Sequence, residues 1–158
     1  MKNPILQTYK FYDYSDIEIE FVIKTKIVDL DSITDLISLK PTRGWSVGDR
    51  YMGKQMNTES KQVETIEREQ NNTLWAFNTG HFVSEPRFEE HAKFLIEKLK
   101  DKKETIKSIL SQGDKFEVNV FITMTIDRSE VNVGLGTSTE LLRELIDLCN
   151  YIEWRTEE

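Results

Sequence analysis

The stretch Leu39–Tyr51, LKPTRGWSVGDRY, holds the side chains of this chain that are best suited to chemistry. A guanidinium group can donate two hydrogen bonds to one carboxylate or phosphate, and glycines let backbone N–H groups approach the same anion. One interpretation is therefore a pocket for a small anionic ligand. In this pocket Arg43 holds the anion, Trp45 stacks on the ligand, and Asp49 orients Arg43 or accepts a proton.

The same residues also suit a purely structural role, and this is the interpretation that we favour. Arg43 then pairs with Asp49 across the turn while Trp45 covers the end of the sheet, because turn glycines and Arg–Asp pairs are common framework. The stretch lacks the GxxxxGK[ST] spacing of a nucleotide-binding loop. Under both interpretations, positions 39–51 form a rigid corner between a helix and the sheet. The candidate binding residues are Thr42, Arg43, Trp45, Asp49, Arg50 and Trp75.

The remaining reactive side chains do not converge on a catalytic or metal site. His81 and His91 are the only histidines, and on a helix that starts near residue 85 the neighbouring glutamates point away from His91. His91 is expected at the edge of the apolar stripe, hydrogen-bonded to a neighbour. Cys149 has no base nearby and is expected to be a small core residue. We therefore predict no catalytic residue, no metal and no cofactor.

Composition narrows the classes of partner. The chain has 158 residues and a formal net charge of −7, so its surface repels phosphate backbones, and nucleic acid is not expected as a ligand. No run of about 18 apolar residues is present, which predicts no membrane span. With one cysteine the chain cannot form an internal disulfide, and a reducing cytoplasm is the compartment that fits.

Periodicity predicts most of the secondary structure. Residues 17–23 alternate as in a strand with one buried face, and a helix with Ser32 as its cap stops before Pro41. Two weaker strands, 63–69 and 73–79, are expected to pair as a hairpin around residues 70–72. The next element is a long helix that Ser84 caps, that starts near residue 85, breaks near 101–103 and ends at Gly113, with an apolar stripe from 88 to 110. It is followed by strands at 116–126 and 131–135, a helix after the capping box 137–140, and a short aromatic tail at 151–154.

This order, β, α, β, β, α, β, β, α, predicts a single α+β domain over residues 1–158, with residues 1–14 as an N-terminal arm. Its first six elements match a split βαβ, or ferredoxin-like, core, in which an antiparallel or mixed sheet has its helices mainly on one face. The last elements form an extra strand-strand-helix unit.

Several of these segments resemble one bacterial family. They are TDLISLKPTRGWSVGD, the tryptophan strand TLWAF, the histidine-bearing helix FEEHAKFLIEKL and the closing VNVGLGTSTELLRELIDL. Together they look like the family catalogued as domain of unknown function 4279, over about residues 15–150. The polar segment 54–70 has no match in this pattern. The resemblance implies no particular activity.

Two functions from different classes fit these observations. The first is a cytosolic, non-enzymatic protein-interaction domain, such as an inhibitor or immunity-type protein that binds a basic partner. Exposed aromatic rings such as Trp45 and Tyr51 beside Arg43 and Arg50 would give it a binding surface of the usual composition. The alternative is a protein that binds a small anionic ligand, or acts on it, through residues 41–51.

Overall fold

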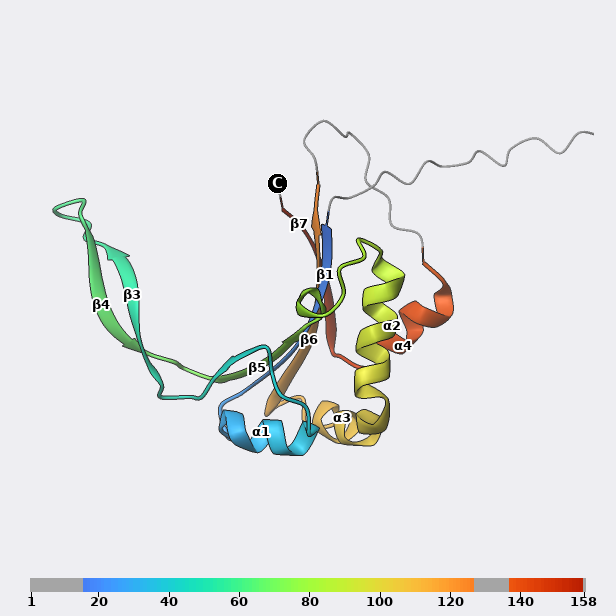
Figure 1. The fold of residues 1–158 in the computed structure, drawn as a ribbon. Helices are drawn as coiled ribbons and strands as arrows, with labels where there is room; N and C mark the ends of the chain where they lie inside the picture. The colour runs from blue at the N-terminus through green and yellow to red at the C-terminus, as the bar shows by residue number, and fades with distance from the viewer. Residues whose placement is uncertain (1–15, 127–136, 158) are drawn as a thin grey trace, which may run out of the picture.

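Helices cover one face of a five-stranded sheet, and a two-stranded ribbon extends from that sheet (Figure 1). The computed structural model describes residues 16–126 and 137–157. The strands are β1 (Asp16–Thr25), β2 (Arg43–Trp45), β3 (Arg50–Met56), β4 (Val63–Glu69), β5 (Thr73–Asn78), β6 (Phe116–Thr125) and β7 (Tyr151–Glu157). The helices are α1 (Leu30–Ile37), α2 (Phe88–Leu99), α3 (Lys103–Leu110) and α4 (Thr139–Ile146), with 3₁₀ turns η1 (Thr79–His81) and η2 (Lys100–Lys102).

The order of strands in the sheet is β2-β5-β1-β6-β7. Strand β1 runs antiparallel to both β5 and β6, so β5 and β6 are parallel to each other with β1 between them. Helices α2 and α3 connect β5 to β6, which makes the split βαβ arrangement that the sequence predicts. The added unit consists of α4 and β7, and β7 is parallel to β6. The predicted strand 131–135 and the predicted N-terminal arm 1–14 lie outside the described residues.

The core lies between the sheet and the helices. Ile17, Ile19, Phe21 and Ile23 of β1 are buried and face the helices, which confirms the alternation expected for residues 17–23. Trp75 lies in the same core, with its ring edge-to-face against Phe21 at 6.2 Å between centroids. Burial of these large apolar side chains is the main force that holds the helices on the sheet.

The helix ends agree with the sequence at some positions and differ at others. Helix α4 begins at the predicted capping segment 137–140, although its N-cap is Ser138 rather than Thr137, the residue three before Glu140, and η2 interrupts the long helix close to the expected break. Helix α1 is capped by Asp29, which accepts a hydrogen bond from Ser32 N at 2.8 Å, so Ser32 lies inside the helix. Helix α2 begins after Arg87 and has no side-chain cap, so the expected role for Ser84 is wrong. Within the described ranges, no helix is long and apolar enough to cross a membrane.

The predicted hairpin of residues 63–69 with 73–79 is wrong, because β4 pairs with β3. The ladder between β2 and β5 continues through hydrogen bonds from Gly48 N to Gln70 O and from Gln70 N to Asp49 O. At this point the two chains leave the sheet together and form the ribbon, residues 50–69. Gly48 has a φ of +85°, a conformation that glycine adopts without strain, and it marks the bend.

Candidate functional site

The corner 39–51 attaches the edge strand β2 to the sheet. Thr42 does this twice, because its N–H donates to Ala76 O at 2.9 Å and its Oγ1 accepts from Asn78 N at 2.9 Å. The same hydroxyl lies 3.2 Å from Ala76 O and donates to it. Thr42 is therefore engaged with the backbone of β5, and this role is structural.

Arg43 does not pair with Asp49, so the ion pair that the sequence suggested is wrong. Arg43 Nη2 donates to both carboxylate oxygens of Glu20, at 3.0 and 2.8 Å. Asp49 instead closes its own turn, with its Oδ2 accepting from Ser46 N at 2.7 Å. Strand β2 places Arg43 on the side of the sheet that carries Glu20, whereas Asp49 lies in the bend beyond the strand.

The two tryptophans of the candidate set lie on opposite faces of the sheet. Trp45 packs on the face without helices, where Arg43 approaches its ring with the guanidinium carbon 5.9 Å from the ring centroid. Trp75 is 0 % exposed and belongs to the helix-side core. Trp75 is therefore not available to a ligand at the corner.

The sixth candidate, Arg50, belongs to the ribbon. Its guanidinium nitrogens lie 3.6 Å from Glu67 and 3.6 Å from Glu69 on the facing strand. The structure thus distributes the candidate residues over the β2–β5 junction, the open side of the sheet, the core and the ribbon. They do not converge on one pocket.

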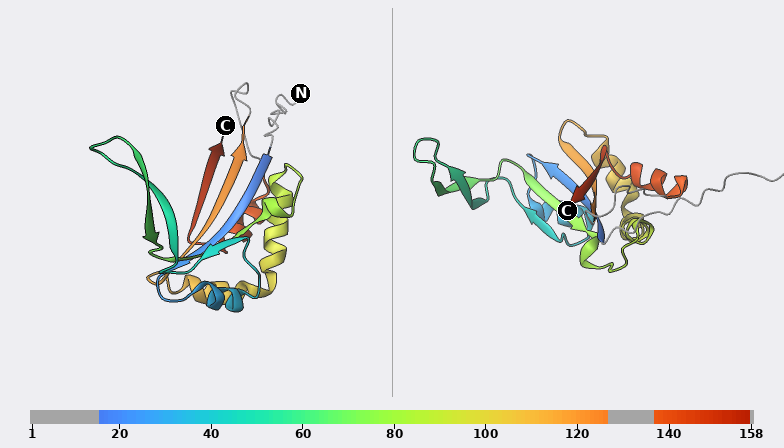
Figure 2. Two further views of the ribbon diagram at one scale, coloured as in Figure 1. Left: turned by 60° about the vertical axis from the view of Figure 1, so that its left-hand side comes forward. Right: turned by 90° about the horizontal axis from the view of Figure 1, so that it is seen from above.

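The sheet face opposite the helices, called here the open face, carries its own small cluster. Val22, Leu74, Ala76 and Phe121 are buried on it although no helix covers them. Long side chains shield the cluster, with Trp45 on one side and Arg155 on the other; the guanidinium carbon of Arg155 lies 3.8 Å from the centroid of the Phe121 ring. Figure 2 shows that the ribbon and the helices stand on different sides of the sheet.

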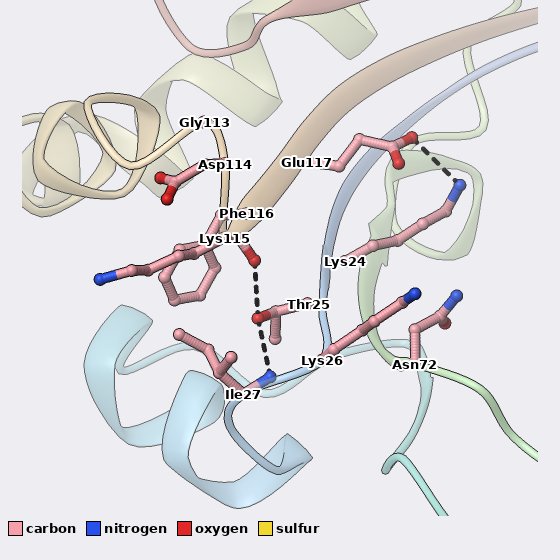
Figure 3. A pocket seen from close by; sticks show the side chains of 10 residues that line it. All are labelled: Lys24, Thr25, Lys26, Ile27, Asn72, Gly113, Asp114, Lys115, Phe116 and Glu117. Carbon is pink, nitrogen blue, oxygen red and sulfur yellow. Dashed lines mark hydrogen bonds and ion pairs between the residues drawn. The ribbon is translucent and has the colours of Figure 1, made fainter.

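A depression of about 460 Å³ at one end of the sheet gathers three lysines: Lys24, Lys26 and Lys115. Lys24 pairs with Glu117 at 3.3 Å, whereas Lys26 and Lys115 have no ion pair within the described part of the chain. In Figure 3 the side chains of Lys24, Lys26 and Asn72 reach one side of the depression, and that of Lys115 points to the other. Hydrogen bonds from Asn119 and then Lys24 lower the pKa of Glu117.

His91 has both ring nitrogens engaged in the interior. Nε2 lies 2.9 Å from Glu85 O, which can only accept, so Nε2 carries the proton. Nδ1 then accepts from the Thr79 hydroxyl at 2.7 Å, and that hydroxyl accepts from Ile19 N at 2.9 Å. Burial lowers the pKa of His91, which keeps the ring neutral. The expected hydrogen-bonded role is confirmed.

Cys149 is not poised for nucleophilic chemistry. Burial raises the pKa of its thiol to about 11, and the Sγ lies 3.4 Å from Leu145 O. A thiol with this pKa is almost entirely protonated at neutral pH. Among the described residues, His, Cys, Asp and Glu side chains form no cluster of three or more that could hold a metal ion.

The sequence reasoning missed the two features that the structure places at the surface. The sequence did not predict the ribbon because its first strand, RYMGKQM, mixes charged, apolar and glycine positions and has no clear period of two. The three lysines come from the end of β1 and the start of β6, which are far apart in the sequence. Only the pairing of β1 with β6 brings them together.

A comparison with protein families identifies one that covers nearly the whole chain. The model of the family described as "Domain of unknown function (DUF4279)" matches residues 14–156. Neither the curated proteins nor the solved structures contain a significant match. The match confirms the resemblance that the corner, the tryptophan strand and the last helix suggested. The chain therefore belongs to the DUF4279 family.

Proposed function

We propose that this protein is a non-enzymatic protein-interaction domain that binds its partner through the ribbon, residues 50–69. The observation that carries the proposal is the exposure of apolar side chains on one face of the ribbon. Met52, Met56 and Val63 are 65 %, 63 % and 61 % exposed. Met56 stands directly opposite Val63 in the ladder, and Met52 follows the same face. Lys54, Thr65 and Glu67 lie on the same face, so exposed apolar side chains here are rimmed by polar ones, a composition that marks interaction surfaces.

The ribbon also lacks apolar burial of its own, which a bound partner would supply. Its strands make their main contacts with each other and project away from the sheet (Figure 1). A two-stranded ribbon with both faces in water is at best marginally stable. Polar pairs across the strands, such as Arg68 to Gln55 at 2.9 Å, give it some internal support. A partner that covered the methionine face would add the missing apolar burial.

Charge favours a basic partner. Residues 50–69 contain four basic and four acidic side chains, so the entire net charge of −7 lies outside the ribbon. An acidic body beside a neutral, partly apolar ribbon would attract a cationic protein and orient its approach. An inhibitor or immunity-type protein for a basic partner is the specific form that we propose.

Affinity capture from native cells, at low salt, tests this function with three forms of the full chain. The ribbon variant carries Met52→Ser, Met56→Ser and Val63→Ser. The control variant carries Ile27→Ser and Leu36→Ser, which alter exposed apolar side chains elsewhere. We expect a basic protein whose recovery falls at least ~10-fold with the ribbon variant, equivalent to about 1.4 kcal/mol, and is unchanged with the control.

Two results would contradict the proposal. One is the absence of any protein that the wild-type chain captures above background. The other is a partner whose recovery is the same for the ribbon variant and the wild type. Equal melting temperatures of the three forms would show that lost capture does not reflect unfolding.

The lysine depression supports a second candidate, the binding of a small anionic ligand. Lys26 and Lys115 form no ion pair among the described residues, although Asp114 and Glu117 also line the depression, whereas Arg43 is already engaged by Glu20. The depression is therefore better suited to an anion than the corner to which the sequence pointed. Inorganic phosphate and citrate, added in a thermal-shift assay, should raise the melting temperature of the wild type. The effect should disappear in Lys26→Ala/Lys115→Ala and persist in Lys54→Ala, which changes a lysine of the ribbon.

A further inference from the structure

Strand β7 ends the sheet, and its outer edge has no strand partner among the described residues. Ile126 N donates to Glu157 O at 3.0 Å, so the carbonyl of Glu157 faces β6. Because successive residues of a strand direct their backbone groups to opposite sides, Ile152, Trp154 and Thr156 direct theirs to this outer edge. Such an edge is ready to pair with another strand.

The sequence of β7, YIEWRTE, is complementary to itself when it runs antiparallel about Trp154. In that register Glu153 stands opposite Arg155, Arg155 opposite Glu153, and Trp154 opposite Trp154. We propose that β7 pairs in this register with β7 of a second copy of the chain. The two sheets then form one continuous sheet across a two-fold axis.

The side chains that meet on the open face have matching charges. Within one chain Arg155 Nε lies 2.8 Å from Glu153 Oε1, and both side chains are partly exposed. In the dimer each carboxylate gains a second guanidinium from the other copy, which makes a network of four alternating charges. Cross-strand pairs of opposite charge stabilise antiparallel strands, and like charges directly opposite destabilise them.

The side chains that meet on the other face are apolar. Trp154 packs on Phe88, with ring centroids 5.6 Å apart, yet it remains 44 % exposed. Beside it lies a hollow of about 340 Å³ whose apolar lining includes Ile146, Cys149 and Ile152. Pairing of the two edges brings both Trp154 rings together at the rim of this hollow and removes apolar surface from water.

The charges of β7 also favour this pairing register over registers in which the two strands are shifted along each other. Charged residues on an edge strand normally discourage pairing. A two-fold axis at Glu153 places Glu153 opposite itself, and an axis at Arg155 places Arg155 opposite itself. Only the axis at Trp154 pairs all seven residues of the strand and sets unlike charges against each other. The edge therefore rejects shifted pairings and accepts this one.

This interface does not depend on the proposed function. Strand β7 lies at one edge of the sheet, whereas the ribbon leaves from β2 and β5 at the other edge. A dimer through β7 therefore leaves both ribbons free at the outer ends of the joined sheet. The two proposals can fail separately.

Sedimentation equilibrium of the full chain, up to roughly 200 µM, tests the pairing. The wild type should have a mass twice the 18.6 kDa of one chain. Glu153→Arg sets two like-charged pairs across the axis and should raise the dimer dissociation constant at least ~10-fold. Adding Arg155→Glu to that variant exchanges the two charges, and it should restore the dimer. Thr156→Pro removes an outward N–H and should also weaken the dimer.

The outcomes separate the alternatives. A wild type that stays monomeric at every concentration overturns the proposal. A dimer that Glu153→Arg and Thr156→Pro both leave intact overturns it too. If the dimer is instead lost in the triple ribbon variant, the ribbon is the self-association surface and β7 is not. Circular dichroism and melting temperature show that each variant is folded.

Discussion

Arg43 shows how the order of strands chooses the partner of a charged side chain. The closest acid in the local sequence is Asp49, and a turn could have joined the two. Strand β2 instead adds to β5, which is next to β1, and Glu20 of β1 is on the same face as Arg43. The pair is partly exposed, so its contribution to stability is small. Its main effect is to occupy the guanidinium that a ligand would need.

Gly44 is required by close packing rather than by its conformation. A Cβ at this position would lie 2.6 Å from Leu30 Cδ1 and 2.8 Å from Leu74 O. We expect Gly44→Ala to lower the free energy of unfolding by about 1 to 3 kcal/mol, the usual cost of overpacking. Gly113→Ala is the matched control, because the nearest atom to its Cβ would be Leu110 O at 3.7 Å. Urea denaturation of both variants measures the difference; equal losses would contradict this account.

His91 should make stability depend on pH. Burial lowers the pKa of the folded-state imidazole below its ordinary 6.5, and Asp16 and Glu18 only partly oppose this. Below pH 6.5 the unfolded state therefore binds a proton more readily than the folded state. Stability is fully present above this pH and is lost as pH falls towards the folded-state pKa, by at most ~1.4 kcal/mol per pH unit.

The test is urea denaturation of the wild type, His91→Gln and His81→Gln between pH 5 and 8. Glutamine does not titrate, so the part of the pH dependence that comes from His91 should vanish in His91→Gln. His81→Gln, at an exposed position, should keep the wild-type slope. Identical slopes in all three proteins would mean that His91 is not the group responsible.

At the scale of elements, the ribbon is an insertion into the split βαβ core. Strands β2 and β5 would form an ordinary hairpin of that core if a short turn connected Asp49 directly to Gln70. The chain instead continues for twenty residues as β3, a turn and β4. Because these strands depend mainly on each other, the ribbon contributes surface rather than core.

Removal of the ribbon should therefore leave the fold intact. Replacing residues 50–69 by Asn-Gly keeps the hydrogen bond from Gln70 N to Asp49 O and supplies residues that favour a two-residue hairpin turn. We expect the melting temperature to change by only a few degrees, and partner capture to be lost. A thermal melt followed by circular dichroism checks the first expectation. Loss of the cooperative transition would show that the ribbon is part of the folding unit.

At the scale of the whole molecule, one core connects the sheet with every helix. Buried side chains from α1, α2, α3 and α4 share a single cluster with those of β1, β5 and β6. The unit of α4 and β7 is thus tied to the split βαβ core rather than appended to it. Leu141 and Leu145 of α4 supply the connection.

We therefore expect the chain to unfold as a single domain. Differential scanning calorimetry should give one transition, with equal calorimetric and van 't Hoff enthalpies. Leu145→Ala removes a fully buried side chain and should lower the temperature of that one transition, with a loss of about 2 to 5 kcal/mol. Two transitions, of which only one responds to this substitution, would contradict a single domain.

The sequence alone determined the elements whose apolar side chains repeat with a regular period. Strands β1 and β6 and helices α2 and α4 follow from spacing, because each buries one face against the same core. Their order was sufficient to predict an α+β domain with a split βαβ core. The candidate residues of the corner also lie at a real structural junction, where Asp49 closes a local turn with Ser46 and Thr42 binds the backbone of β5.

Only the tertiary structure decided which strands pair and which charges meet. The sequence of β4 would also allow a hairpin with β5. Both faces of β4 are open to solvent, so it has no apolar period that would set its pairing register. The Arg43–Glu20 pair and the three lysines likewise join residues that are distant in the chain. Local propensity depends on residues that are close in the sequence. These pairings instead depend on residues that are far apart in the sequence and that only the sheet places next to each other.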